Sequence, residues 1–405
     1  MMHLPVLLAL LGPLAATVTA TNSSSTGPDA DGKYWIYGTG IRASFIPYGA
    51  SVSNLLVRDQ WGIERDLVGG FDNASYYGID RQHPHFGGVP GRYANRIRNS
   101  SFEVDGTTYH VLPNENPEPP LYPDGVDTLH GGPHGWDWRN FSVVAHTASS
   151  ISFSLVDPAG SQGFPGEVEG LVTYALGDHT WQLQMSAAAT TARTPIMLSS
   201  HVYWNLDGFA NNETNTVLNH SLYLPHSGLR VATDSILIPT GDLVANQPGS
   251  VNDFWTTPKQ LGANFSSPAL RGNCGFNCTG YDTCYLVSRE AGTYDWRDSL
   301  VARLQSPWSG IQLDVFSDQQ AFQMYSCSGQ NGSLALKRTQ GLFGDDAPFP
   351  RTIPQYGCVV LEVEDWIDGI NQPAWGRQDR QVFGPGDAPF ELQATYRFSI
   401  NTTAV

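Results

Sequence analysis

Hydrophobic and polar positions alternate with a period of two in many short segments of the chain. Eight such segments have strand length: ISFSLVD, LVTYAL, WQLQMSA, LVARLQ, IQLDVF, AFQMYSC, CVVLEVE and LQATYRFSI. A period of two places successive side chains on opposite faces of a sheet, so these segments predict β-strands. They recur at short intervals, with no repeat of fixed length and no clear domain boundary. The simplest architecture is one large antiparallel sandwich.

Turn residues separate these segments and mark two long loops. FEVDGTTYHV (102–111) has Asp105-Gly106 between two alternating runs, which is a strong hairpin signal. Residues 113–125 (PNENPEPPLYPDG) and 341–357 (GLFGDDAPFPRTIPQYG) are too rich in proline for a central strand. Loops of this kind line a binding cleft about as readily as they decorate a surface, so both interpretations stay open.

Composition agrees with a β-rich protein and disfavours some partners. Hydrophobic residues make up 40% of the 405 residues and charged residues only 15%, and the 42 glycines and 27 prolines favour turns over long helices. The formal net charge is −16, with no lysine or arginine cluster to offset it. Because such a chain repels phosphate backbones and anionic lipids, we expect no nucleic-acid and no membrane partner.

The N-terminus is typical of a secreted protein. Residues 1–20 predict a signal peptide, with an apolar stretch over 4–14 and a small-residue cleavage site at 18–20. That stretch is too short to span a bilayer. Residues 21–32 are small and polar and predict a flexible mature N-terminus. A single domain is expected over residues 33–405.

N-glycosylation sequons support the same interpretation. They occur at Asn22, Asn73, Asn99, Asn140, Asn212, Asn219, Asn264, Asn277, Asn331 and Asn401. A secretory route would place many of them on surface loops. A chain rich in Ser, Thr and Asn also forms sequons by accident, so some are expected to be unused. We therefore expect a secreted, extracellular protein that carries N-glycans.

Five cysteines lie in the last third of the chain, and their odd number leaves at least one unpaired within the chain. Cys274 and Cys278 flank a glycine-containing loop and could close a small ring. Cys327 and Cys358 each lie at the end of a predicted strand, and Cys284 is the fifth. No partner set has metal-ligand spacing, which disfavours a zinc site. The disulfide pairing stays open.

Two histidines have the surroundings expected of a sugar site. His130 lies in DTLHGGPHGWDW, directly before two glycines that let the backbone turn tightly. His201 lies in MLSSHVYWNLDG beside Tyr203 and Trp204. Aromatic rings offer apolar faces to the C–H groups of a sugar, while polar neighbours bind its hydroxyls. From context alone, each histidine is more often structural than catalytic.

Two histidine pairs are also candidates for metal binding. His130 and His134 have helical i, i+4 spacing, but the intervening Gly-Gly-Pro argues against a helix. His83 and His85 form a second, looser pair. Neither pair has a third potential ligand at a sequence spacing typical of metal sites, so we expect no metal.

Candidate carboxylates follow a strand with a buried pattern. CVVLEVEDWIDGINQP contains Glu362 and Glu364, which strand alternation places on the same face. A partly desolvated carboxylate on a rigid strand can act as a general base. Spacing does not choose between the two, and both could instead be ordinary solvent-facing residues. There is no nucleophile elbow, P-loop, dinucleotide fingerprint or HExxH, which disfavours common hydrolases, kinases and dehydrogenases.

The ordered motifs resemble those of the aldose 1-epimerase family, from roughly residue 33 to 400. LHGG alone would be a weak signal, but the ordered set is specific. The motifs are GRYANRI (91–97), LHGG (129–132), HVYWNL (201–206), ILIPTG (236–241), GYD (280–282) and LEVEDWIDGINQP (361–373).

This resemblance implies a fold, an activity and a set of site residues. The fold would be all-β, a large antiparallel β-supersandwich of the galactose-mutarotase type. The activity would be interconversion of the α and β anomers of a free monosaccharide without any cofactor, by a monomer or a weak dimer. The resemblance implies that the catalytic base is Glu362, the general acid is His201 and the second active-site histidine is His130. It implies three ligands of the substrate hydroxyls: Asn95, Arg96 and Asp282.

The implied chemistry is acid–base ring opening. Glu362 would take the proton of the C1 hydroxyl while protonated His201 donates to the ring oxygen, and His130 would polarise that oxygen or position the sugar. A glutamate with a pKa of ~4.3 and a histidine with a pKa of ~6.5 would hold the required opposite charge states at mildly acidic to neutral pH.

The chain departs from the family pattern near the motifs. Ser200 replaces a usual Asn and Trp204 a common Phe, while Asp127-Thr128 replaces the usual Asn-containing lead into LHGG. The loop over 113–125 is an insertion before that motif. These changes bear on sugar preference more than on the reaction.

Two other functions fit the same fold. A non-catalytic sugar-binding protein would have no reason to retain the complete Glu/His/His set. A hexose-6-phosphate 1-epimerase would need a basic phosphate pocket, which the acidity and the secretion signal argue against.

Overall fold

The computed structural model describes residues 27–82, 85–289, 295–344 and 347–401. The predicted signal peptide lies outside these residues, as do most of the predicted flexible segment, the sequon at Asn22 and His83. No helix within the described ranges has the length and apolar character needed to cross a membrane.

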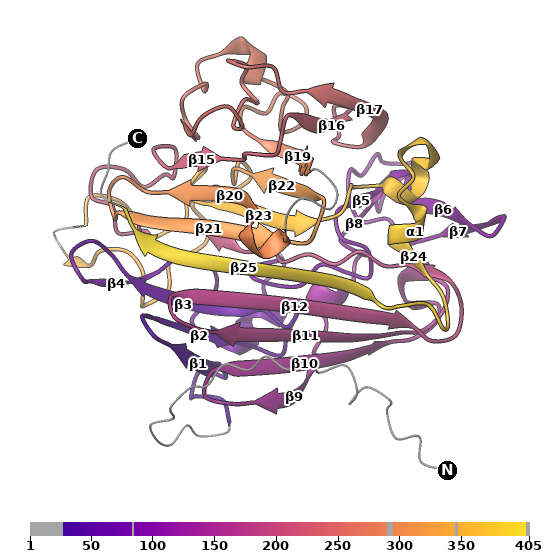
Figure 1. Cartoon of the computed structure of the whole chain (residues 1–405), viewed down its shortest axis with the longest axis horizontal. Coiled ribbons are helices and arrows are strands. Elements are labelled where there is room, and N and C mark those ends of the chain that lie inside the picture. Colours follow the sequence, from indigo (N-terminus) through magenta and orange to yellow (C-terminus); the bar gives the residue numbers. More distant parts are fainter. Residues whose placement is uncertain (1–26, 83–84, 290–294, 345–346, 402–405) are drawn as a thin grey trace.

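The largest sheet has nine antiparallel strands, and its longest members lie side by side across the front of Figure 1. Burial alternates strictly along β11 and β12, so one face of this sheet packs inward. From edge to edge the strands are β18 (Lys259–Gln260), β15 (Ser221–Tyr223), β20 (Leu300–Gln305), β21 (Ile311–Ser317), β25 (Phe390–Ile400), β12 (Thr180–Ala189), β11 (Val168–Leu176), β10 (Ser150–Asp157) and β9 (Ser142–His146).

In Figure 1 a six-stranded sheet extends above the large sheet, with β16 and β17 at the top, and a four-stranded sheet lies at the lower left. The six-stranded sheet contains β14 (Tyr203–Trp204), β23 (Val359–Glu364), β22 (Ala321–Tyr325), β19 (Asp282–Leu286), β16 (Leu229–Thr233) and β17 (Pro239–Ala245), in that order. The four-stranded sheet contains β1 (Tyr34–Gly38), β2 (Ile41–Phe45), β3 (Val52–Arg58) and β4 (Glu64–Asp66). All residues of β23 are buried, because both faces of this strand are covered.

Short elements complete the fold. The two-stranded ladders are β5 (Arg96–Ile97) with β8 (Thr128–Leu129), β6 (Ser101–Val104) with β7 (Thr107–His110), and β13 (Thr194–Pro195) with β24 (Val382–Phe383). The helical elements are α1 (Gln378–Gln381) and the 3-10 turns η2 (Ala74–Gly78), η3 (Arg98–Ser100), η4 (Trp136–Trp138), η5 (Ser161–Gly163), η6 (Pro268–Leu270), η7 (Trp296–Asp298), η9 (Gly369–Asn371) and η10 (Pro373–Trp375).

The predicted hairpin at residues 102–111 is confirmed as β6–β7. Asp105 and Gly106 form its two-residue turn, with φ angles of +53° and +76°. Positive φ at both positions is what a type I′ turn requires, and it matches the right-handed twist of the strands. The eight segments predicted from alternation are likewise strands, β10, β11, β12, β20, β21, β22, β23 and β25.

One hydrophobic core joins the inner faces of the three large sheets. Aromatic rings bridge the layers: Phe45 of β2 stacks on Tyr174 of β11 with ring centroids 4.4 Å apart. Trp204 of β14 contacts Trp181 of β12 and Tyr396 of β25. Buried aromatic surface of this size is a major source of stability. The fold class predicted from the sequence, an all-β antiparallel supersandwich, is confirmed.

Two disulfides cross-link the last third of the chain. Cys274 pairs with Cys278 and closes the small ring anticipated from the sequence, and Cys327 pairs with Cys358. Cys284 is free and buried. The Cys327–Cys358 bridge therefore holds the start of β23 against the chain that follows β22.

Candidate active site

Strand register brings His201 and Glu362 together. In the ladder between β14 and β23, Tyr203 pairs with Val360. Continuing this antiparallel register by two residues sets His201 opposite Glu362 on the same face. Nε2 of His201 lies 3.6 Å from Oε1 of Glu362. On the other side of β23, Glu362 pairs with Gln323 of β22, so Glu362 is held within the six-stranded sheet.

A second pair of site residues, Asn95 and His130, flanks the β5–β8 ladder: Asn95 directly precedes β5 and His130 directly follows β8. The backbone N–H of His130 donates to the backbone carbonyl of Asn95 at 3.0 Å, and the backbone N–H of Asn95 donates to Nδ1 of His130 at 3.1 Å. Both residues have positive φ, 50° and 58°. A Cβ at Gly131 would lie 2.0 Å from the carbonyl oxygen of Gly91, so the first glycine of LHGG is required by close backbone packing.

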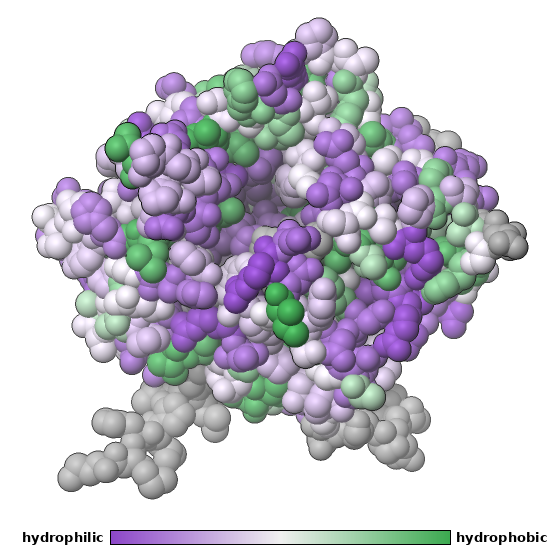
Figure 2. Space-filling view, turned by 180° about the vertical axis from the view of Figure 1, so that it is seen from behind, coloured by the Kyte–Doolittle hydropathy of each residue, from purple (hydrophilic) through white to green (hydrophobic). Residues whose placement is uncertain are grey.

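These elements enclose a cavity of about 220 Å³. It is lined by His85, Asn95, Arg96, Glu115, Leu129, His130, His201, Tyr203, Asp282, Gln323, Tyr325 and Glu362. All six site residues predicted from the sequence are in this set. The face turned away in Figure 1 is hollowed near its centre, with mostly hydrophilic residues around the opening (Figure 2).

Arg96 lies between two carboxylates of the cavity wall. Its Nε and Nη2 donate to Glu115 at 2.8 and 2.7 Å, and Nη2 lies 3.7 Å from a carboxylate oxygen of Asp282. Gln323 donates to the other oxygen of Asp282 at 2.5 Å. A bidentate guanidinium–carboxylate pair fixes both side chains in orientation. The arrangement offers several fixed donors and acceptors to a polyhydroxylated ligand.

The two glutamates of β23 have different surroundings. Oε2 has no hydrogen-bond partner within the described residues in either glutamate, but only Glu362 lines the cavity. Glu364 is fully buried and accepts a hydrogen bond from Nδ2 of Asn95 at 3.1 Å. The possibility that both are solvent-facing is therefore wrong. Glu362 is the one that a ligand can reach, while Glu364 orients Asn95.

Burial shifts the protonation of the central pair. Burial raises the pKa of Glu362 well above its ordinary value, and the adjacent Glu364 carboxyl adds to this. Burial also lowers the pKa of His201 well below its ordinary value, and His85 adds to this. In the empty site, glutamic acid and neutral histidine are therefore favoured. The sequence predicts ordinary pKa values, with a negative glutamate and a positive histidine. The buried site favours neither charged form in Glu362 and His201.

His130, His201 and Glu362 are close enough to be tested as a metal site, since their ligand atoms all lie within 4.8 Å of one another. The hydrogen bond from the Asn95 amide occupies the lone pair of Nδ1 in His130. The neutral ring then carries its hydrogen on Nε2, which makes that atom a donor and not a metal ligand. This tautomer suits hydrogen bonding to a hydroxyl or ether oxygen better than metal coordination.

Comparison with known proteins identifies the family. Residues 35–379 match the family model described as aldose 1-epimerase. A probable aldose 1-epimerase of Arthroderma benhamiae is 41% identical, covering 96% of this chain and 93% of its own length. Human galactose mutarotase is 30% identical, covering 89% and 92%. The chain belongs to the aldose 1-epimerase family.

The shape of the molecule agrees with this membership. A solved structure of an aldose epimerase homologue from C. elegans superposes with a TM-score of 0.73 at 26% identity. The superposition covers 91% of this chain and 99% of the C. elegans chain. The epimerase fold therefore extends over nearly all of the described residues.

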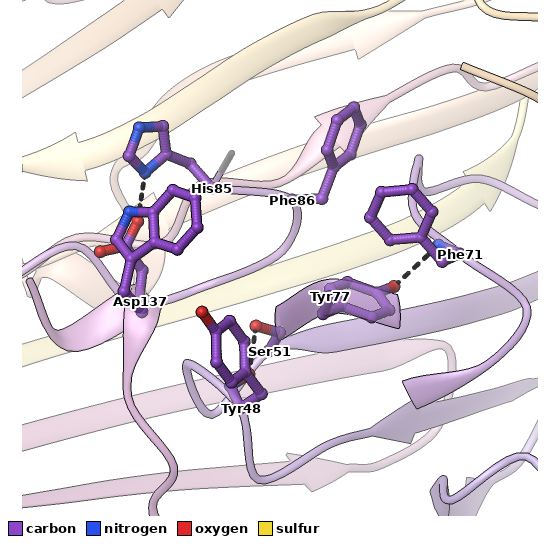
Figure 3. Close-up of a pocket in the computed structure, with 8 residues that line it drawn as sticks. Tyr48, Ser51, Phe71, Tyr77, His85, Phe86 and Asp137 are labelled. Carbon is purple, nitrogen blue, oxygen red and sulfur yellow. Dashed lines mark hydrogen bonds and ion pairs between the residues drawn. The ribbon is translucent and has the colours of Figure 1, made fainter. Parts of the chain in front are cut away.

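Four polar residues of this epimerase cavity were not predicted as site residues. His85 was considered only in a loose metal pair, although it lines the cavity and pairs with Asp137 (Figure 3). Gln323 and Tyr325 lie in the strand AFQMYSC, where an amide in an apolar run was the available signal. Glu115 comes from the proline-rich loop over 113–125, so the cleft-lining interpretation holds for that loop. The other loop, over 341–357, contributes none of the cavity's described lining residues.

The departures from the family pattern have separate outcomes. Trp204 is fully buried among core aromatics and does not line the cavity, so it does not contact a sugar there directly. Asp127 is buried; burial and a hydrogen bond with Glu115 raise the pKa of Asp127 to about 7. The altered lead into LHGG thus supports the inserted loop that carries Glu115. Nothing in the structure explains Ser200.

Proposed function

We propose that this enzyme is an aldose 1-epimerase that interconverts the α and β anomers of a free aldose such as glucose or galactose. The observation that carries the proposal is the pairing of Glu362 with His201 at 3.6 Å inside a polar cavity. At this distance one group can take the proton of the C1 hydroxyl while the other gives a proton to the ring oxygen, and both oxygens are bonded to C1.

The ring opens by two proton transfers. Glu362 takes the proton of the C1 hydroxyl while His201 gives a proton to the ring oxygen. The C1–O5 bond breaks, its electrons go to O5, and C1 becomes an aldehyde. Rotation about C1–C2 presents the other face of the aldehyde, and the same steps run backwards. No bond to the protein forms, and each positioned proton transfer contributes roughly 10²–10⁴-fold.

The protonation favoured by burial matches the open-chain stage. After ring opening, Glu362 carries a proton and His201 is neutral, which are the forms that the buried site favours. From there Glu362 can protonate the aldehyde oxygen while His201 accepts the proton of the O5 hydroxyl. The site thus stabilises the protonation state from which either anomer recloses.

The remaining residues would hold the sugar. Nε2–H of His130 is free to donate to the ring oxygen, because Nδ1 is engaged by Asn95. Arg96 and Asp282 would bind hydroxyls by charge-assisted hydrogen bonds. The aromatic ring of Tyr203 offers an apolar face to C–H groups.

Cavity size and charge favour an unphosphorylated monosaccharide. About 220 Å³ is below the roughly 300 Å³ lower limit of typical pockets for drug-sized ligands, which suits one sugar ring. Arg96 is the one Lys or Arg side chain among the described lining residues, and its guanidinium already lies between the carboxylates of Glu115 and Asp282. A phosphate group would be repelled, which argues against a hexose-6-phosphate substrate.

We also propose that the protein is secreted and N-glycosylated. The apolar segment over residues 4–14 and its cleavage site support this. Of the nine sequon asparagines that the structure describes, seven are exposed, two are half-buried and none is buried. Two disulfides also suit an oxidising compartment.

The decisive experiment is polarimetry of freshly dissolved α-D-glucose and α-D-galactose. Wild-type enzyme should accelerate the change in rotation, and Glu362→Gln should reduce kcat by roughly 10²–10⁴-fold because the base is lost. Glu103→Gln, on the exposed face of β6, is the matched control and should behave as wild type. Glu364→Gln should lose far less, because a Gln oxygen still accepts from Asn95.

Equal rates for Glu362→Gln and wild type would show that the base is misassigned. Sugar binding by a wild-type protein that has no effect on the rate would instead favour the non-catalytic sugar-binding alternative.

A further inference from the structure

His85 separates the sugar-sized cavity from a second, smaller cavity behind it. It is among the lining residues of both. Figure 3 shows the smaller cavity, where His85 and Asp137 face each other on one side and Tyr48, Ser51 and Tyr77 lie on the other. Unlike those residues, His85 is therefore within reach of a sugar.

Asp137 gives His85 a fixed orientation. Nδ1 of His85 contacts Oδ2 of Asp137, whose side chain is fully buried in η4. The other carboxylate oxygen, Oδ1, has no hydrogen-bond partner within the described residues. Because an unpaired buried carboxylate is costly, Nδ1 must carry the hydrogen that is donated to Asp137. Nε2 of His85 is then the nitrogen left for the sugar-sized cavity.

The backbone around His85 is tied to His201. The Gly87 amide donates to the His201 carbonyl at 2.9 Å, and the His201 amide donates to the Gly88 carbonyl at 3.0 Å. His85 itself has a φ of +71°, which is uncommon for a residue with a side chain. The two hydrogen bonds to His201 fix the backbone that follows His85, which helps to hold this conformation.

The three imidazoles form one contiguous group. The ring centroid of His85 lies 4.7 Å from that of His130 and 5.5 Å from that of His201. His130 and His201 are themselves 5.1 Å apart. A ring at this position contacts both predicted histidines as well as the cavity.

We propose that His85, oriented by Asp137, is a third functional histidine of the site, which binds a sugar hydroxyl through Nε2 and positions the rings of His130 and His201. This inference rests on the proposed mutarotase function and adds a substrate-binding group to it. Asp137 acts through His85 and is a positioning residue.

The test compares His85→Gln, Asp137→Asn and a matched control, His134→Gln. A Gln amide at position 85 can still donate to Asp137, so the fold should be retained, which circular dichroism and thermal melting would verify. His134 is exposed in the same LHGGPHGWD segment as Asp137 and serves as the control. Each variant is measured by polarimetry for KM and kcat, and by calorimetric titration with D-galactose for binding alone.

We expect His85→Gln to raise KM and the galactose dissociation constant about three- to ten-fold, the loss that one hydrogen bond typically causes. Asp137→Asn should shift both in the same direction, because Nδ1 loses its charged partner. His134→Gln should match wild type. Unchanged KM and binding in a folded His85→Gln variant would overturn the proposal.

A second readout separates function from mere structure. His201 is faced by Glu362, His130, Tyr203 and His85. After burial, His85 is the next cause that lowers the pKa of His201. Removing it should move the acidic limb of the kcat/KM profile to higher pH, whereas an unmoved limb would contradict close coupling of the rings.

Wild-type protein that binds galactose without accelerating mutarotation would refute the mutarotase function, yet the binding comparison would still decide the role of His85. Absence of any binding by wild-type protein would overturn both.

Discussion

Glu362 and His201 illustrate how burial changes the chemistry of ordinary side chains. Each would titrate close to its usual pKa in water, with the carboxylate negative and the histidine positive between those values. In the folded chain the carboxyl keeps its proton to higher pH and the imidazole stays neutral to lower pH than in water, because both charged forms lose hydration. The pair then keeps one proton in total over a wide range of pH. A single proton that moves between two groups is what reversible ring opening requires.

The pH profile tests this pairing. The state with one proton is lost at low pH when His201 gains a second proton, well below the ordinary histidine value of 6.5. It is lost at high pH when Glu362 loses the last proton, well above the ordinary glutamate value of 4.5. The plateau of kcat/KM should therefore extend below 4.5 or above 6.5, or both. Polarimetry from acidic to alkaline pH, corrected for the spontaneous reaction, measures it. A narrow bell confined between those two values would contradict the assigned shifts.

At the scale of elements, the strands were predictable and the assembly of the site was not. Long strands such as β11 and β12 are predictable because hydrophobic and polar residues alternate in them over many positions. Strand β14 has two residues and β5 and β8 have two each, too few to show any period. Yet the register of β14 on β23 sets His201 opposite Glu362, and the β5–β8 ladder joins Asn95 to His130. Such register depends on contacts between distant segments, which local patterns do not contain.

The same limit explains His85 and Glu115. Each comes from a loop, and each reaches the cavity only because another segment fixes it. His85 needs Asp137, which follows 52 residues later in the chain. Glu115 needs Arg96, which precedes it by 19 residues. The family motifs identified the residues on strand ends and ladders, whereas these two loop residues carry no local signal of their role.

Alternation within β14 predicts opposite effects for neighbouring substitutions. Tyr203 lines the cavity, whereas Trp204 points into the core with no exposed surface. Trp204→Ala should destabilise the fold by about 3–5 kcal/mol and leave the order of sugar preference unchanged. Tyr203→Leu should raise KM, because it removes the aromatic face that the cavity offers to sugar C–H groups. Urea unfolding and a polarimetry panel of sugars measure the two properties, and a changed sugar preference in folded Trp204→Ala would contradict this division.

At the scale of the whole molecule, the described sequon asparagines lie apart from the cavity that holds the site. The cavity lies at the junction of the six-stranded sheet with the β5–β8 ladder. The described sequon asparagines are distributed over other parts of the chain, and none of them lines the cavity. Bulky glycans on exposed loops can thus add solubility without closing the entrance. A strongly acidic surface adds to solubility and does not oppose a neutral sugar.

Removal of the glycans should therefore leave catalysis intact. If the protein is secreted by a eukaryotic host, mass spectrometry should find glycans on exposed sequons such as Asn73, Asn140 and Asn331, and less occupancy at the half-buried Asn264. Enzymatic deglycosylation under native conditions should keep kcat/KM within about twofold, since none of the sequon asparagines that the structure describes lines the cavity. Protein taken through mock deglycosylation is the control. A large loss of kcat/KM after glycan removal, with the fold intact by circular dichroism, would show that a glycan contributes to the site.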